Sequence, residues 1–202
     1  MENEIEIEAK FYIKDFSFIE NRLLSLGAVC TQPRVHEINL RFDFPNRSLS
    51  KDHRVLRLRQ DNNALLTYKG PSAPGENVSV RQEIEFEVSN FQAARHFLEA
   101  LGYEVVIMYE KFRTVYQMDV VEVAMDEMPF GTFIEIEGPD AAAIQVAAAV
   151  LRLNWALRCS ESYLGLFNRL CQKRNLSLEN LSFQEFEGIT VQPEDMDLKP
   201  AD

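Results

Sequence analysis

The chain has 202 residues, of which 46% are hydrophobic and 26% are charged, and its formal net charge at pH 7 is −11. This length is enough for one core with a small appendage, and no apolar run approaches a membrane span, so we expect a cytoplasmic protein without a membrane partner. The acidic balance argues against a nucleic-acid partner, because affinity for phosphate backbones comes mainly from basic surface. Cys30, Cys159 and Cys171 show no CxxC or metal-ligand spacing and are expected to be free thiols.

The hydrophobic period, the helix caps and the turn residues predict strands and helices in a mixed order. Strands are expected over residues 4–13, 29–43, 55–60, 64–69, 80–88, 103–117, 120–126 and 132–137. Helices are expected from Asp15 or Ser17 to Gly27, from Asn90 to Leu101, after Pro139, and from about residue 160 to residue 174. Gly70-Pro71 and Pro74-Gly75 mark a loop that is expected to be mobile. This order is typical of an α+β fold with antiparallel hairpins.

Charged residues occupy every second position in five segments of the predicted strands. The segments are EIEIEAK at 4–10, RLR at 57–59, RQEIEFE at 81–87, KFR at 111–113 and EIE at 135–137. Because strand side chains alternate between faces, each strand has one charged face and one apolar face. Charged faces buried in a sandwich would be costly, whereas a water-filled barrel keeps them solvated. We therefore expect a closed antiparallel barrel of about eight strands, with flanking helices and a polar tunnel inside.

The charged residues on these faces are of two kinds with complementary chemistry. The basic ones suit phosphate oxygens, because guanidinium groups bind them bidentately and lysine adds a compact charge; they are Arg57, Arg59, Lys69, Arg81, Lys111 and Arg113. The acidic ones stand two residues apart and can offer oxygens to Mg²⁺ or Mn²⁺; they are Glu6, Glu8, Glu135 and Glu137. Cations and carboxylates in one tunnel indicate a metal-bound polyphosphate.

These residues also carry a resemblance to a known family. The EIEAK at 6–10 resembles the ExExK signature of the CYTH superfamily, the triphosphate tunnel metalloenzymes, which include class IV adenylate cyclases, thiamine triphosphatases and inorganic triphosphatases. The match continues in order through LRLR at 56–59, LTYKGP at 66–71, RQEIEFEV, EKFRTVY at 110–116, VAMDEM, GTFIEIEG and ESYLGL at 161–166. It covers about the first 170 residues and is most similar to the class IV cyclase-like branch. The family fold is an eight-stranded antiparallel tunnel.

The resemblance implies a role for each matched residue. The implied metal ligands are Glu6, Glu8, Glu135 and Glu137. The implied triphosphate-binding residues are Lys10, Arg57, Arg59, Lys69, Lys111 and Arg113. The charged strand faces add Arg41 and Arg81 as candidate substrate-binding residues. Lys69, Asp126 and Glu85 are the implied catalytic residues. Arg41 is a departure, because this chain has LRFD at 40–43 where many relatives have YFD or YYD. That tyrosine is thought to help activate water in some relatives, so Arg41 either adds a phosphate contact or pairs with a carboxylate on its own face.

Three features keep a purely structural reading open. Arg81, Glu83 and Glu87 are explained about as well by salt bridges at the rim as by substrate binding. Tyr163 is expected to pack its helix against the barrel rather than to touch substrate. Residues 175–202 form an acidic tail, with seven acidic residues and one basic residue, that follows a tunnel domain over residues 1–174. The tail could be disordered, could bind a partner or could dock on the barrel, and the spacing of Phe183 and Phe186 favours docking.

The expected function is that of a metal-dependent enzyme acting on a triphosphate. Hydrolysis of inorganic triphosphate or of a small organic triphosphate is favoured over the cyclisation of ATP to cyclic AMP and pyrophosphate. A third alternative, kept open by Arg41, is a module that binds triphosphate or polyphosphate without turning it over. The expected partner is a triphosphate-containing small molecule, the expected metal is Mg²⁺ or Mn²⁺, and the expected assembly is a monomer or a homodimer.

Overall fold

The computed structural model describes residues 5–73 and 78–202. Glu4, where the first predicted strand begins, and the Pro74-Gly75 pair of the predicted loop lie outside the described residues. Within the described ranges, no helix is both long enough and apolar enough to cross a membrane.

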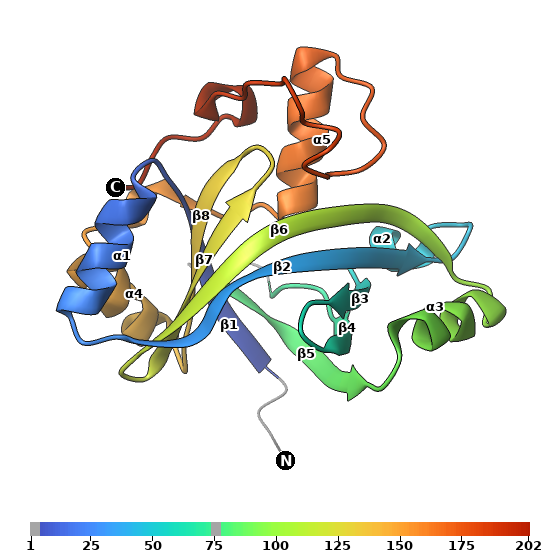
Figure 1. Ribbon diagram of the computed structural model, residues 1–202, viewed down its shortest axis with the longest axis horizontal. Coiled ribbons are helices and arrows are strands. Elements are labelled where there is room, and N and C mark those ends of the chain that lie inside the picture. The colour runs from blue at the N-terminus through green and yellow to red at the C-terminus, as the bar shows by residue number, and fades with distance from the viewer. Residues whose placement is uncertain (1–4, 74–77) are drawn as a thin grey trace.

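A closed ring of antiparallel strands dominates the fold (Figure 1). In the described part of the chain the ring has eight strands: β1 (Ile5–Ile13), β2 (Val29–Asp43), β3 (Val55–Gln60), β4 (Ala64–Lys69), β5 (Ser79–Val88), β6 (Glu104–Met118), β7 (Val121–Met128) and β8 (Gly131–Glu137). Their order is β5-β4-β3-β2-β6-β7-β8-β1, and an additional pairing of β5 with β1 closes the ring. The predicted antiparallel closed arrangement is confirmed.

Strand β1 closes the ring by pairing with two strands at once. Ile5 to Glu8 pair with β5, and Glu8 to Ile13 pair with β8. The short strand β9 (Arg158–Cys159) then takes the free edge beside Lys10 and Phe11. Phe11 and Ile13 have no exposed surface and belong to the outer core, whereas Glu6, Glu8 and Lys10 on the opposite face of β1 line the interior. The alternation in the sequence therefore places the charges inside the ring.

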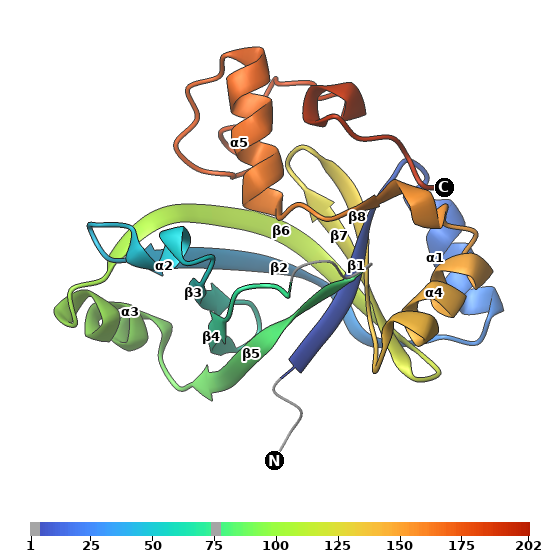
Figure 2. The same ribbon diagram turned by 180° about the vertical axis from the view of Figure 1, so that it is seen from behind.

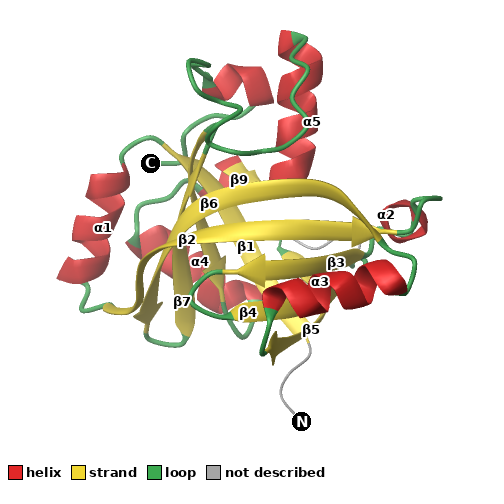
Figure 3. Cartoon of the chain, turned by 45° about the vertical axis from the view of Figure 1, so that its right-hand side comes forward, coloured by secondary structure: helices red, strands yellow, loops and turns green. Residues whose placement is uncertain are grey.

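Helices cover the outer face of the ring in separate places (Figures 2 and 3). α1 (Phe16–Ser25) and α4 (Ala141–Val150) pack on the apolar faces of β1, β7 and β8, and α3 (Phe91–Ala100) packs on the side of β2 and β3. The predicted caps Asp15 and Asn90 accept hydrogen bonds from Phe18 N and Ala93 N, which satisfies amides at the two helix starts. The short helix α2 (Ser48–Lys51) follows β2.

The acidic tail packs into the core instead of extending from it. It follows α5 (Tyr163–Arg174), and Leu181 pairs with β6 through hydrogen bonds of 3.1 Å to Met108 O and 2.9 Å from Glu110 N. Leu181, Phe186 and Met196 are buried together with the apolar face of α5. The tail therefore docks, as the spacing of its aromatic residues favoured, and its apolar side chains share one hydrophobic cluster with α5.

Candidate active site

The charged strand faces line a cavity of about 950 Å³ inside the ring. All the predicted site residues except Asp126 lie on its wall: Glu6, Glu8, Lys10, Arg41, Arg57, Arg59, Lys69, Arg81, Glu85, Lys111, Arg113, Glu135 and Glu137. Asp126 is fully buried directly behind that wall. Residues from eight strands, far apart in the sequence, are thus brought to one cavity.

Asp126 anchors two of the cavity's cations. Lys111 Nζ donates to its Oδ2 at 3.0 Å, and Arg113 binds both of its oxygens at 2.6 Å. Such bidentate pairs are strong and directional. Burial opposes the charge of Arg113, but Asp126 outweighs burial and raises the pKa of Arg113 well above its ordinary value. With both oxygens engaged, Asp126 is better placed to orient cations than to contact a substrate itself.

Glu85 has a similar relation to the two arginines of β3. Its carboxylate lies 3.3 Å from Arg57 and 3.3 Å from Arg59, and it accepts a hydrogen bond of 2.6 Å from Thr67 Oγ1. Burial alone would raise the pKa of Glu85, but Arg59 and the Thr67 hydroxyl hold it below its ordinary value. Both guanidinium groups are thereby turned toward the cavity, whose wall they line.

The four predicted metal ligands fall into two groups. Glu6 lies 2.6 Å from Lys69 Nζ and 2.8 Å from Arg81 Nε, and these two cations outweigh burial and lower its pKa to about 2. Glu135 pairs with Lys10 at 3.2 Å and also with Arg113. Each of these two carboxylates is therefore neutralised by cations in the structure.

Glu8 and Glu137 form the second group, and their surroundings are acidic. Glu137 lies directly opposite Glu8 on β1 and directly opposite Glu122 on β7. Glu137 keeps exposed surface, but desolvation within the ring, followed by repulsion from neighbouring carboxylates, raises its pKa to about 7. Burial and Glu135 raise the pKa of Glu8 as well, although Arg81 lies 3.3 Å away. The sequence reading missed Glu122, which stands four residues before Asp126 on the same strand face.

The donor chemistry of this acidic group fits a hard divalent cation. Carboxylate oxygens are the ligands that Mg²⁺ and Mn²⁺ prefer, and a cation among them would relieve their repulsion. Among the described residues, no three acidic, histidine or cysteine side chains already converge on one point. Glu8, Glu122 and Glu137 are the residues best suited to hold a metal, and the predicted roles of Glu6 and Glu135 require their present ion pairs to exchange.

Arg41 differs from every other cation on the described cavity wall. Lys10, Arg57, Arg59, Lys69, Arg81, Lys111 and Arg113 each lie within 4.0 Å of a carboxylate, and Arg41 has no ion pair in the described ranges. The carboxylates on its own strand are engaged elsewhere, since Asp43 accepts hydrogen bonds from Leu49 N and Ser50 N, and Glu37 lies 3.5 Å from Lys111. Burial lowers the pKa of Arg41. Its charge faces the cavity uncompensated.

Tyr163 does more than the sequence reading expected. It packs α5 against the ring, as predicted, and it also lines the cavity. Its hydroxyl donates to Asp126 Oδ2 at 2.8 Å, and its ring lies under the ammonium of Lys10. A tyrosine at a helix start carries no charge pattern, so the alternation that revealed the other residues could not reveal this one.

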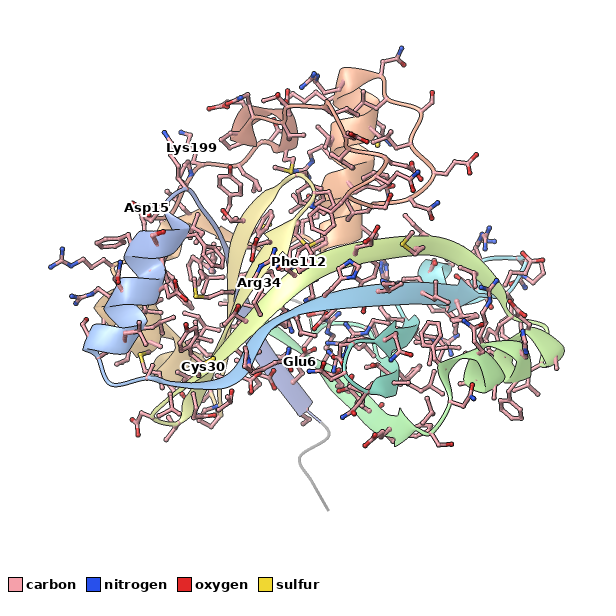
Figure 4. The ribbon with its side chains drawn as sticks, in the orientation of Figure 1. Glu6, Asp15, Cys30, Arg34, Phe112 and Lys199 are labelled. Carbon is pink, nitrogen blue, oxygen red and sulfur yellow. The ribbon has the colours of Figure 1, made fainter. Side chains whose placement is uncertain are left out.

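The outer face of the ring carries charges of a different kind. Arg34 of β2 stacks on Phe112 of β6, with its guanidinium carbon 3.6 Å from the ring centroid, and its Nε lies 2.7 Å from Glu127. Figure 4 labels Arg34 and Phe112, which lie away from Glu6. Glu87, on the same strand face as Arg81, is exposed and is not on the cavity wall. Arg81 and Glu83 do line the cavity, so the inward face of β5 is divided between the cavity and the surface.

Comparison with known proteins identifies the family of this chain and shows solved structures with a similar fold. The chain matches the CYTH domain model over residues 4–161 and belongs to that family. Over 136 aligned residues it is 29% identical to a Methanocaldococcus jannaschii protein provisionally named an adenylate cyclase. The aligned region covers 66% of this chain and 76% of that protein. A Vibrio parahaemolyticus structure with the same provisional name aligns with a TM-score of 0.73 at 22% identity, covering 83% of this chain and 99% of the other.

A Hippeastrum structure adds an activity to the comparison. That protein, provisionally named an adenylyl cyclase, is described as having a dominant triphosphatase activity. It aligns with a TM-score of 0.52 at 18% identity and covers 96% of this chain and 100% of its own, a likeness of fold. Membership of the CYTH family, shown by the match over residues 4–161, makes the present chain a triphosphate-related enzyme of a kind that generally depends on a divalent metal ion.

Proposed function

We propose that the protein hydrolyses inorganic triphosphate or a small organic triphosphate with the help of Mg²⁺ or Mn²⁺. The observation that carries this proposal is the division of one cavity into a basic wall on β2, β3, β4 and β6 and an acidic group around Glu8, Glu122 and Glu137. A linear triphosphate presents several negative oxygens to the basic wall. The acidic group supplies ligands for the metal that must accompany such an anion.

The basic residues bind and orient the phosphates in this proposal. Arg57, Arg59 and Arg113 offer paired N–H donors, and Lys10, Lys69 and Lys111 offer compact charges. Because most of these cations now pair with glutamates, binding exchanges carboxylate oxygens for phosphate oxygens. The exchange of Lys69 and Arg81 would free Glu6. When bound, the metal would neutralise phosphate charge and lower the pKa of a coordinated water.

The smallest substrate, inorganic triphosphate, is favoured by the chemistry of the wall. The aromatic rings on it include Tyr109 and Tyr163, and both hydroxyls are bonded, to Arg57 at 3.5 Å and to Asp126 at 2.8 Å. The ring of Tyr163 is already covered by Lys10. A nucleobase that stacked on this face of the Tyr163 ring would therefore have to displace Lys10. The uncompensated charge of Arg41 instead suits one more phosphate oxygen.

Adenylate cyclisation is the second candidate, supported by the provisional names of the relatives. Cyclisation would use the same residues to bind three phosphates but a different nucleophile. In that reaction the ribose 3′ hydroxyl attacks the α-phosphate, and pyrophosphate leaves. A binding module without turnover is the third candidate. Arg41 supports it, because this residue has no ion pair within the described ranges and stands where the family motif of the sequence resemblance has tyrosine.

Parallel incubations separate the three candidates. Inorganic triphosphate, thiamine triphosphate and ATP are each supplied with Mg²⁺ and with Mn²⁺, and the products are identified. We expect inorganic triphosphate to give the highest kcat/KM, with orthophosphate and pyrophosphate as products and no turnover in excess chelator. Selectivity is read from the ratio of kcat/KM values, since a grip shared by all three lowers KM without discriminating. Cyclic AMP as the main product from ATP would establish the cyclase, and tight binding of all three without product would establish the module.

A further inference from the structure

Tyr163 is uncharged, but it contacts Lys10 and also the Asp126 carboxylate that binds Lys111 and Arg113. Its hydroxyl donates to Asp126 Oδ2 at 2.8 Å, and its ring centroid lies 4.1 Å from Lys10 Nζ and 5.6 Å from Lys111 Nζ. The residue is 8% exposed. Burial, followed by Asp126 and Glu135, raises the pKa of the hydroxyl well above its ordinary value, so it remains a neutral donor.

The ring and a carboxylate hold a lysine in different ways. A cation above an aromatic face is attracted by the ring quadrupole, and the attraction grows when water is excluded. The ring carries no net charge, however, so it positions the ammonium of Lys10 without cancelling its charge. Glu135, which lies 3.2 Å from the same nitrogen, does cancel it. If a phosphate displaces Glu135, the contact between the ring and Lys10 remains.

The hydroxyl reaches two further cations through Asp126. The Oδ2 atom that accepts from Tyr163 also accepts from Lys111 at 3.0 Å and from Arg113 at 2.6 Å. A third donor on one oxygen restricts the rotation of the carboxylate and therefore the directions in which both cations point. Tyr163 thus contacts Lys10 directly and reaches Lys111 and Arg113 through Asp126.

Helix α5 holds Tyr163 firmly in this place. Ser162 caps the helix by accepting from Gly165 N at 3.1 Å, and the Tyr163 ring packs edge-on against Phe133 at 5.1 Å between centroids. Phe167, one turn further on, packs against Phe186 of the tail. The family-model match ends at residue 161, and the ESYLGL motif at 161–166, which contains Tyr163, begins where that match ends.

We infer, taking the triphosphate of the proposed function as the ligand, that Tyr163 is a positioning residue that sets Lys10 directly, and Lys111 and Arg113 through Asp126, for phosphate binding. It touches these groups and not the reacting atoms. Its loss is therefore expected to weaken triphosphate binding and to raise KM more than it lowers kcat.

The test uses two substitutions and a matched control in the full chain. Tyr163→Leu removes the ring and the hydroxyl, Tyr163→Phe removes the hydroxyl alone, and Phe167→Leu makes the same aromatic-to-leucine change one turn along, away from the cations. The dissociation constant for inorganic triphosphate is measured by calorimetry in chelator, together with Tm, KM and kcat. We expect Tyr163→Leu to raise the dissociation constant roughly tenfold and Tyr163→Phe about two- to fivefold. Phe167→Leu is expected to lower Tm and to leave binding within about twofold.

Two results would overturn the inference alone while wild-type protein still binds. One is unchanged binding in Tyr163→Leu. The other is an equal loss of binding in Tyr163→Leu and Phe167→Leu, which would assign the effect to helix packing. Failure of the wild-type protein both to bind triphosphate in chelator and to turn it over with Mg²⁺ or Mn²⁺ would instead contradict the proposed function and overturn the inference with it.

Discussion

Glu8 and Glu137 lie directly opposite each other on β1 and β8, and both have a raised pKa. Their proximity costs free energy whenever both are ionised, because like charges on paired strands repel. A cation between them would remove that cost. The same repulsion that suits a metal site therefore destabilises the metal-free protein.

Replacing Glu137 should stabilise the metal-free protein in a pH-dependent way. The folded-state pKa of about 7 lies above the ordinary 4.5, so the group favours folding below pH 4.5 and loses that contribution as the pH rises to 7. We expect Glu137→Gln to raise Tm in chelator at pH 8 by roughly 2–4 °C, with a smaller gain at pH 5. The exposed Glu87→Gln is the control. An equal gain in Tm at both pH values would mean that the ionised Glu137 side chain does not destabilise the folded protein.

Arg57 should bind phosphate through its planar fork. Removing one hydrogen-bonded charge contact costs about 1.5–3 kcal/mol, so Arg57→Ala should raise KM for inorganic triphosphate at least roughly tenfold. Arg57→Lys should recover only part of this loss. Arg95→Ala is a matched control, because Arg95 pairs with Glu99 at 2.8 Å on the surface of α3. Equal kinetic constants for Arg57→Ala and Arg95→Ala would remove Arg57 from the binding site.

We expect Arg41 to lower the stability of the folded protein while strengthening triphosphate binding. Its buried charge has no ion pair within the described ranges, so Arg41→Gln is expected to raise Tm by a few degrees while raising KM for triphosphate roughly tenfold. A fall in Tm would show that the arginine has a stabilising contact in the free protein. Arg41→Tyr restores the residue of many relatives, and a rise in kcat would show that water activation limits the wild-type enzyme.

Truncation after Arg174 should unfold part of the core. It would remove Leu181, Phe186 and Met196, which are 0%, 5% and 0% exposed, and burying each such side chain contributes about 1.5–3 kcal/mol. We expect poor solubility or a Tm lower by more than about 10 °C, measured by circular dichroism. Lys173→Ala, which breaks a surface ion pair with Asp197, should change Tm by only about 1–2 °C. An unchanged Tm after truncation would restore residues 1–174 as an independent domain.

Local pattern was enough to predict much of this protein. The alternation in 6–10, 57–59 and 111–113 correctly predicted which side chains face inward, because successive strand residues point to opposite faces whatever their partners are. The caps Asp15 and Asn90 were equally readable, since a cap and the amide it satisfies are three residues apart. The ordered motifs then indicated the family, which the match over residues 4–161 confirms.

Only the tertiary structure decided which charges meet. Alternation says that Glu6, Glu8, Glu135 and Glu137 face inward, but ring closure and register place Glu6 beside Lys69 and Glu137 beside Glu8 and Glu122. The lack of an ion pair to Arg41 among the described residues and the place of Tyr163 beside Lys10 depend equally on how distant segments pack. A strand's two faces follow from local backbone geometry, whereas its neighbours and register follow from long-range packing, which no short sequence window contains.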